Sequence, residues 1–191
     1  MGARIRSFLA IELAPAARDA AVAAADALRA RPGGERVRWV RPENLHVTLH
    51  FLGSIHPDRM AVLADQVGRE TAAREPFSLH LGALRGFPPR RPRVASLEVG
   101  PEIELVELAA AVSRGVVASG LPGAERPFRP HLTLGRLRDG RFPDASDLPD
   151  ADADSPVREV VLFESTLGRG GATYTPLERM PLGGAITPNP A

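Results

Sequence analysis

Two short strings in this chain each place a histidine two positions before a threonine. Residues 46–49 read His-Val-Thr-Leu, and residues 131–134 read His-Leu-Thr-Leu. Both strings alternate apolar with polar residues, which is typical of a half-buried strand. Because residues i and i+2 of a strand face the same side, each histidine is predicted to point the same way as its threonine. If the two strands faced one another, two imidazoles and two hydroxyls would surround one substrate.

The four side chains concerned are His46, Thr48, His131 and Thr133. An imidazole has an ordinary pKa of about 6.5, so it can give or take a proton near neutral pH. The two histidines are therefore candidates for a general acid and a general base. The near-identity of the two strings leaves open which histidine has which role. The alternative interpretation is that both strings are surface strands carrying ordinary polar residues.

Composition narrows the class of protein. The chain has 191 residues, of which 43% are hydrophobic and 25% charged, as in a soluble globular protein of one domain or two small lobes. It has no cysteine, so disulfides and thiolate-ligated metal sites are excluded. No apolar run approaches the length that spans a bilayer, and the N-terminus lacks the apolar core of a signal peptide. We therefore expect a cytoplasmic protein with no membrane association.

All 24 basic residues are arginine, and lysine does not occur. A GC-rich genome would account for this bias, but its consequence is physical, because the planar guanidinium matches the oxygens of a phosphate in pairs. The arginines gather in residues 85–93 and 126–141, whereas acidic residues gather between 139 and 154. A formal net charge of +1 with local basic patches fits a phosphate-bearing ligand better than a broad surface for a nucleic-acid duplex.

Hydrophobic periodicity and Gly/Pro breaks predict an alternating order of strands and helices. Strands are expected at 4–13, 36–40, 45–52, 77–84, 93–99, 130–137, 157–167 and 172–181, and helices at 15–31, 58–74 and 101–119. Residues 139–156 are predicted to be a mobile loop, and 183–191 a disordered tail. This order predicts an α+β fold in one domain, residues 1–182. We expect two similar lobes related by an approximate two-fold axis, each an antiparallel sheet with helices on its outer face, and an active-site groove between them.

At this level of detail the chain resembles the two-histidine (2H) phosphoesterase superfamily, and within it the RNA 2′,3′-cyclic phosphodiesterases, also called 2′-5′ RNA ligases. The resemblance covers residues 4 to 182, with no departure at the motif positions. It rests on the strings at 6–11 (Arg-Ser-Phe-Leu-Ala-Ile), 38–49 (Arg-Trp-Val-Arg-Pro-Glu-Asn-Leu-His-Val-Thr-Leu), 51–53 (Phe-Leu-Gly), 126–136 (Arg-Pro-Phe-Arg-Pro-His-Leu-Thr-Leu-Gly-Arg) and 167–174 (Leu-Gly-Arg-Gly-Gly-Ala-Thr-Tyr).

The resemblance implies that water opens a ribose 2′,3′-cyclic phosphate at an RNA end and leaves a 2′-phosphomonoester, without metal or cofactor. His131 would be the base that deprotonates water, and His46 the acid that protonates the departing O3′. The hydroxyls of Thr48 and Thr133 would hydrogen-bond the other phosphate oxygens. Run in reverse, the same site would join a cyclic end to a 5′-hydroxyl. The implied partner is RNA with a 2′,3′-cyclic end, tRNA-like or a small oligonucleotide, with no obligate protein partner.

Four further residues are candidates for substrate binding. His50 shares strand parity with His46, so it is predicted to border the groove, although a solvent-facing position at the strand end is the alternative. Arg129 could reach the phosphate or the 5′ side of the nucleotide. A regular strand would turn Arg136 away from the site, and a bulge or pairing with a nearby carboxylate would change that orientation. Phe87, near the arginines at 90, 91 and 93, could stack on RNA or fill the core.

Two other functions are compatible with the same residues. One is hydrolysis of another small phosphodiester, such as 2′-5′ oligoadenylate or ADP-ribose cyclic phosphate. The other is a non-catalytic module that holds an RNA end. A binding module has no need of two matched imidazoles, which favours an enzyme.

Overall fold

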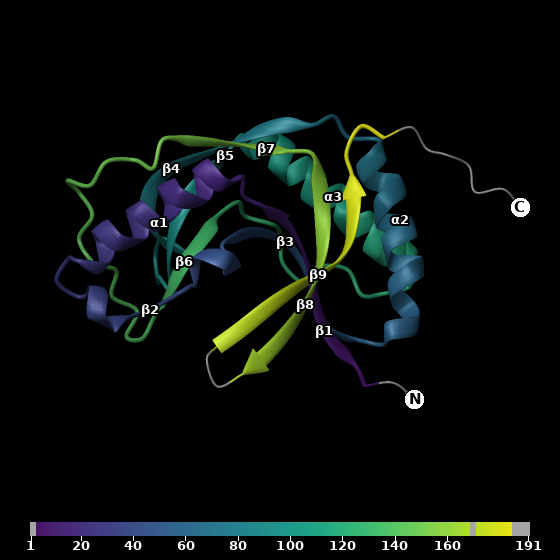
Figure 1. The fold of residues 1–191 in the computed structure, drawn as a ribbon, viewed down its shortest axis with the longest axis horizontal. Helices are drawn as coiled ribbons and strands as arrows, with labels where there is room; N and C mark the ends of the chain where they lie inside the picture. The colour runs from purple at the N-terminus through teal and green to yellow at the C-terminus, as the bar shows by residue number, and fades with distance from the viewer. Residues whose placement is uncertain (1–2, 169–170, 185–191) are drawn as a thin grey trace, which may run out of the picture.

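Two antiparallel sheets and three α-helices form the fold of the computed structural model, which describes residues 3–168 and 171–184 (Figure 1). The strands are β1 (Ile5–Glu12), β2 (Val37–Trp39), β3 (His46–Ile55), β4 (Phe77–Phe87), β5 (Val94–Gly100), β6 (Leu132–Leu137), β7 (Ala153–Val157), β8 (Glu159–Gly168) and β9 (Gly171–Pro181). The helices are α1 (Pro15–Arg29), α2 (Met60–Ala72) and α3 (Glu102–Ala118). The α+β fold class is thereby confirmed.

The two sheets do not correspond to two successive halves of the chain. The first sheet has the order β3-β1-β8-β9, and the second has the order β2-β6-β5-β4-β7. The hairpin β8–β9 therefore returns from the end of the chain to lie beside β1, as Figure 1 shows where yellow-green strands meet the purple strand. Each sheet contributes one motif, through β3 in the first and β6 in the second.

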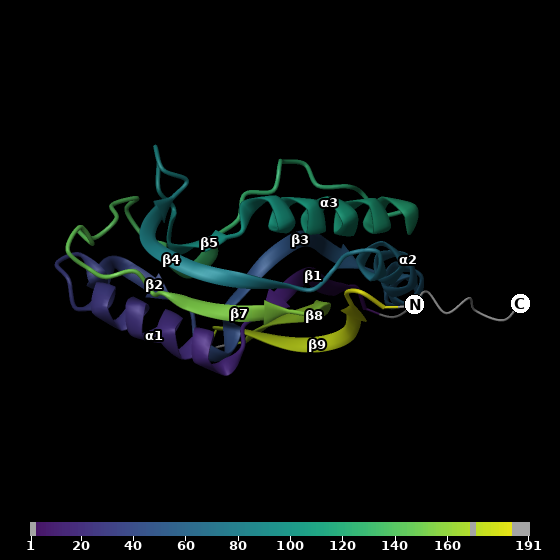
Figure 2. The same ribbon diagram turned by 90° about the horizontal axis from the view of Figure 1, so that it is seen from above.

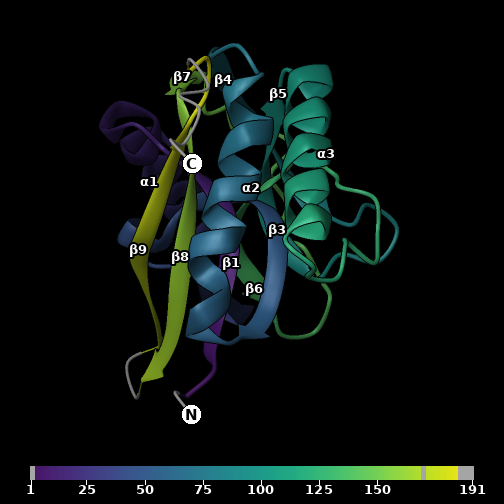
Figure 3. The same ribbon diagram turned by 90° about the vertical axis from the view of Figure 1, so that its right-hand side faces the viewer.

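The helices cover the sheets on different sides. Figure 2 shows α1 on one side of the strands and α3 on the other, and Figure 3 shows α2 and α3 side by side. The two helices approach closely at Gly115, where a Cβ atom would lie 2.6 Å from Cα of Val67. Helix α1 begins at Pro15, whose missing N–H is not needed in the first turn. Among the described residues, no helix is long and apolar enough to cross a membrane.

Strand β1 is buried on both faces, and this positions the site. On one face, Leu9 and Ile11 join the main hydrophobic core. On the other face, Phe8 and Ala10 form a smaller cluster with side chains of β8, against which Tyr174 packs. Because successive side chains of a strand alternate between faces, one strand supports the core and an aromatic wall at the same time.

Strand β7 is missing from the sequence prediction, which has a loop over residues 139–156. It pairs with β4, with Ser155 opposite Leu79. Its residues include Asp154 and Pro156, which are poor strand formers, but Pro is tolerated because β7 is an edge strand. The prediction is therefore wrong from Ala153 onward. Of the predicted disordered tail, residues 185–191 lie outside the described part of the chain.

Candidate active site

The two motif histidines lie in one pocket between the sheets, with a volume of about 340 Å³. All four motif residues line it, as the paired strings predict. Arg136 also lines it, whereas His50, Phe87 and Arg129 do not. The pocket lining includes nine further side chains to which the sequence assigned no role: Arg6, Ser7, Phe8, Val40, Asn44, Phe51, Ser54, Ser165 and Tyr174.

Both imidazoles are held by the same kind of contact, a hydrogen bond from Nδ1 to the backbone carbonyl two residues earlier. Nδ1 of His46 lies 2.7 Å from the carbonyl oxygen of Asn44, and Nδ1 of His131 lies 2.8 Å from that of Arg129. A carbonyl oxygen only accepts hydrogen bonds, so in each ring Nδ1 carries the proton and donates it. When either ring is neutral, Nε2 is therefore the nitrogen with the free lone pair.

The two Nε2 atoms differ in what surrounds them. Nε2 of His46 lies 2.8 Å from Oγ1 of Thr48, so in the neutral ring it accepts the hydroxyl proton of that threonine. Within residues 3–168 and 171–184, Nε2 of His131 has no hydrogen-bond partner. The lone pair of His131 is therefore available to a ligand, and that of His46 is already engaged.

Each imidazole is stacked on a phenylalanine from another strand of its own sheet, His46 on Phe8 of β1 and His131 on Phe87 of β4. The rings of Phe8 and His46 have centroids 4.8 Å apart and planes inclined by 29°. The rings of Phe87 and His131 are closer, at 4.1 Å and 12°. Tyr174 also meets His46 edge-on, with centroids 5.3 Å apart. Such contacts fix the plane of each imidazole as well as its hydrogen bond.

Burial keeps both histidines neutral. It lowers the pKa of His46 to about 4, although the Asn44 carbonyl raises the pKa, and the charge of His131 lowers it further. Burial also lowers the pKa of His131, against the opposing effect of the Arg129 carbonyl and together with the Arg129 charge. Both rings are therefore largely uncharged at neutral pH in the free protein. An anion between them would raise both pKa values, because a negative charge favours the protonated ring.

A β-bulge follows each motif and changes which side chains face the pocket. In β3, Leu9 pairs with His50 and Ala10 with Thr48, so Leu49 has no partner. In β6, Ala95 pairs with Gly135 and Ser96 with Thr133, so Leu134 has no partner. An unpaired residue reverses the alternation of the side chains beyond it. Phe51 and Arg136 consequently face the pocket.

The prediction that His50 borders the groove is wrong. His50 is 4% exposed, does not line the pocket and hydrogen-bonds the backbone of Pro122, which has only a carbonyl to offer. Its strand parity with His46 would hold in a regular strand. The bulge at Leu49 turns it to the buried face instead.

Phe87 and Arg129 act on His131 from outside the pocket. The Arg129 guanidinium carbon lies 5.2 Å from the centroid of the Phe87 ring, and that ring stacks on His131. The half-buried Phe87 thus stacks on a catalytic candidate. That Phe87 also stacks on RNA stays a prediction. The prediction that the Arg129 side chain reaches a phosphate stays a prediction.

The pocket has an aromatic wall and a basic wall. Phe51 is 71% exposed at the side formed by the first sheet, next to Phe8 and Tyr174. Arg136 belongs to the second sheet and is exposed. No carboxylate is among the lining residues, and no group of three or more His, Asp or Glu side chains in the described ranges could hold a metal ion.

Comparison with known proteins agrees with this geometry. Residues 17–166 match a family model described as the 2′-5′ RNA ligase superfamily. A relative from Methanothermobacter thermautotrophicus, named RNA 2′,3′-cyclic phosphodiesterase, is 31% identical over 182 residues, which are 92% of this chain and 97% of the relative. A relative of the same name from Geobacillus stearothermophilus is 34% identical over 152 residues, or 77% of this chain, but the match spans only 48% of that relative's length. A crystal structure of E. coli LigT complexed with 3′-AMP has a TM-score of 0.76 and 32% identity, over 94% of this chain and 98% of that one.

Proposed function

This chain belongs to the 2′-5′ RNA ligase superfamily, and we propose that it hydrolyses RNA 2′,3′-cyclic phosphate ends to 2′-phosphomonoesters. The observation that carries the proposal is the pairing of His46 and His131 in one pocket, each with Nδ1 bonded to a carbonyl. Opening a cyclic phosphate requires one proton to be removed from water and one to be given to the leaving oxygen. Two imidazoles held in this way supply both transfers.

His131 acts as the general base. Its Nε2 lone pair has no partner among the described residues, so it is free to accept a proton from a water molecule. The water oxygen then forms a bond to phosphorus as the bond from phosphorus to O3′ breaks. His131 gains one proton in this step and becomes positively charged.

His46 acts as the general acid and gives its Nε2 proton to O3′. In the free protein the pKa of His46 is about 4, so the ring is neutral near pH 7 and must take up a proton when the substrate binds. The phosphodiester anion raises that pKa when it enters the pocket, because the protonated ring is attracted to it. Protonation also reverses the bond to Thr48, whose hydroxyl then accepts from the ring. A proton passes back from His131 through solvent to restore the starting state.

Charge on the non-bridging phosphate oxygens is balanced by the side chains around them. The hydroxyls of Thr48 and Thr133 line the same pocket as the two rings, and so does the Arg136 guanidinium. Fixed donors of this kind stabilise the transition state without having to reorganise. Arginine is suited to the task because its N–H groups match two phosphate oxygens at once.

The aromatic wall favours a nucleotide over a simple phosphodiester. A phenylalanine that is 71% exposed loses much of its hydrophobic stabilisation unless a ligand covers it. Phe51 lines the pocket, and a nucleobase stacked on it would cover the ring. We therefore assign the base of the terminal nucleotide to Phe51.

The test is incubation with RNA that ends in a 2′,3′-cyclic phosphate, in the presence of EDTA, with the product resolved as a 2′- or a 3′-phosphate. We expect a 2′-phosphate at an unchanged rate. A 3′-phosphate product would overturn the assignment of O3′ as leaving group. Loss of activity on chelation would overturn metal-independent catalysis. Binding of the RNA without turnover would favour the alternative of a non-catalytic module.

A further inference from the structure

In the second sheet, a row of residues that lie opposite one another crosses four strands. The row begins at Phe87, whose ring stacks on His131, and ends at the edge of the sheet. Phe87 of β4 lies opposite Val94 of β5, which in turn lies opposite Arg136 of β6. Arg136 also lies opposite Arg38 of the edge strand β2. Residues directly opposite one another in paired strands project from the same face of a sheet. Because Arg136 lines the pocket, Arg38 lies beside it on the pocket face, one strand farther out.

The pairing of Arg38 with Arg136 is unfavourable for the protein alone. Like charges directly opposite one another destabilise a sheet. Both side chains are exposed, and neither forms an ion pair with a carboxylate in the described part of the chain. Strands β2 and β6 approach closely beside Arg38 and Arg136, since a Cβ atom on Gly135 would lie 2.4 Å from Cγ1 of Val37. The two positive charges are thus held together without a counter-charge from these residues.

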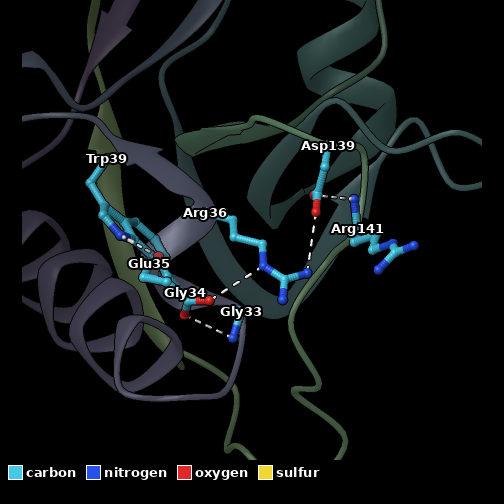
Figure 4. Close-up of polar contacts among 7 residues, drawn as sticks. All are labelled: Gly33, Gly34, Glu35, Arg36, Trp39, Asp139 and Arg141. Atoms are coloured by element: carbon cyan, nitrogen blue, oxygen red, sulfur yellow. Dashed lines mark hydrogen bonds and ion pairs between the residues drawn. The ribbon is translucent and has the colours of Figure 1, made fainter.

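Arg36, two residues before Arg38, shows that this part of the chain can neutralise an arginine. Figure 4 shows its guanidinium between two carboxylates, at 3.3 Å from Glu35 and 3.2 Å from Asp139. A backbone N–H of Arg141 holds the same aspartate in place. The counter-charges therefore serve Arg36, while the pair on the pocket face is left for an anion from outside.

We propose that Arg38 forms a second phosphate site, which binds the phosphodiester on the 5′ side of the terminal nucleotide. This rests on the proposed function, in which Arg136 contacts the reacting phosphate. Neighbouring strands are about 4.8 Å apart, so Arg38 is one strand spacing farther from the reacting centre. An anion there relieves the repulsion between the two arginines. The substrate class is then an oligonucleotide end, in preference to a nucleoside 2′,3′-cyclic phosphate, which has no second phosphate.

The test compares three substrates with the same terminal nucleotide. These are the nucleoside 2′,3′-cyclic phosphate, the dinucleotide with a natural linkage, and the dinucleotide with a neutral methylphosphonate linkage. For the wild type we expect kcat/KM to be about tenfold higher for the natural dinucleotide than for the other two, as for one charge-assisted hydrogen bond. Arg38→Gln should remove this advantage, and Arg38→Lys should keep part of it, because lysine retains the charge but not the fork.

Arg158→Gln is the matched control, because it also removes one exposed arginine that has no carboxylate partner in the described residues. Arg158 directly precedes β8 and is seven residues from the pocket residue Ser165, roughly 23 Å along a strand. It should keep the tenfold advantage. The salt dependence offers a second readout: for the natural dinucleotide, Arg38→Gln should reduce the slope of log KM against log salt by about 0.7.

The outcomes separate the two proposals. Equal losses on all three substrates in Arg38→Gln, or a methylphosphonate dinucleotide as good as the natural one, would overturn the second phosphate site. If the wild type turns over the mononucleotide with no dinucleotide advantage, only the second site fails. If it turns over none of the three, the proposed function fails and takes the second site with it.

Discussion

Asn44 and Ala172, which are 128 residues apart in the chain, are joined by a 2.8 Å hydrogen bond from the side-chain amide to the backbone carbonyl. The backbone carbonyl of the same asparagine accepts Nδ1–H of His46. Asn44 is 8% exposed, so the bond is shielded from water. The C-terminal hairpin and the proposed acid thus share one anchoring residue.

Replacement of Asn44 should affect both partners. Asn44→Ala removes the donor and leaves the part-buried carbonyl of Ala172 without this hydrogen bond, which costs about 1–3 kcal/mol of unfolding free energy. We expect kcat to fall more than KM changes, because the orientation of His46 is disturbed. Urea unfolding and steady-state kinetics measure the two effects. Asn44→Asp is the matched variant: it keeps the shape but not the donor, so it should fail similarly, and wild-type behaviour would contradict the role of the amide.

The two pocket histidines should be indispensable for turnover but not for folding. His46→Asn and His131→Asn should each lower kcat by about 10²–10⁴, the usual contribution of general acid–base catalysis. His50→Asn makes the same change at a histidine outside the pocket and should stay within a few-fold of wild type. Kinetics together with a melting curve for each variant decide this. A pocket variant within tenfold of wild type would refute its assigned transfer.

The lowered pKa values place the activity of the free enzyme at acid pH. In the profile of kcat/KM, the acid limb follows deprotonation of His131 and the alkaline limb follows loss of the His46 proton. Both pKa values lie below 6.5, with that of His46 at about 4, so the maximum of kcat/KM should lie below pH 6.5. Bound phosphate raises the pKa of His46, so the alkaline limb of kcat should lie at higher pH. If the alkaline limbs of kcat and kcat/KM coincide, the substrate does not raise the pKa of His46.

The same pKa of His46 predicts a loss of stability in acid. The unfolded chain takes up the proton near pH 6.5, but the folded protein does so only near pH 4. Unfolding is therefore increasingly favoured as pH falls between these values, by up to about 3 kcal/mol below pH 4. His46→Asn should lose less stability than wild type between pH 7 and pH 4, as measured by urea unfolding. An equal loss in both proteins would show that another group is responsible.

The stacking of Phe87 on His131 should matter for the orientation of the base. Phe87→Leu removes the ring but keeps an apolar side chain, and we expect a lower kcat. With less burial, the pKa of His131 should rise towards 6.5, so the acid limb of kcat/KM should move to higher pH. Phe87→Tyr keeps the ring and serves as the control. If the leucine and tyrosine variants have identical pH profiles, the ring has no such role.

The sequence contained the chemistry of the site but not all of its geometry. The paired His-x-Thr strings predicted the four motif residues because strand parity holds over three residues. Beyond the two threonines the alternation of side chains is broken, because Leu49 of β3 and Leu134 of β6 are bulged residues without a partner. Neither position carries a glycine or proline that would signal a bulge. His50 was therefore assigned to the wrong face, and Arg136 depended on a bulge that only the structure reveals.

Long-range pairing was also beyond the sequence. The α+β class, the three helices and most strands follow from periodicity within short windows. The return of β8 to β1, and the contact of Tyr174 with His46, depend on register between distant segments. A single sequence carries no signal for that register. The roles of Asn44 and Tyr174 were missed for this reason.

The place of β1 between β3 and β8 also has a consequence for synthesis on the ribosome. Both motif strands are synthesised before β8, the strand that covers the other side of β1. The carbonyl of Ala172, which accepts the hydrogen bond from the Asn44 side chain, is synthesised later still. A product truncated between residues 138 and 158 would thus contain both His-x-Thr strings but lack β8 and β9, and with them Ser165 and Tyr174 of the pocket.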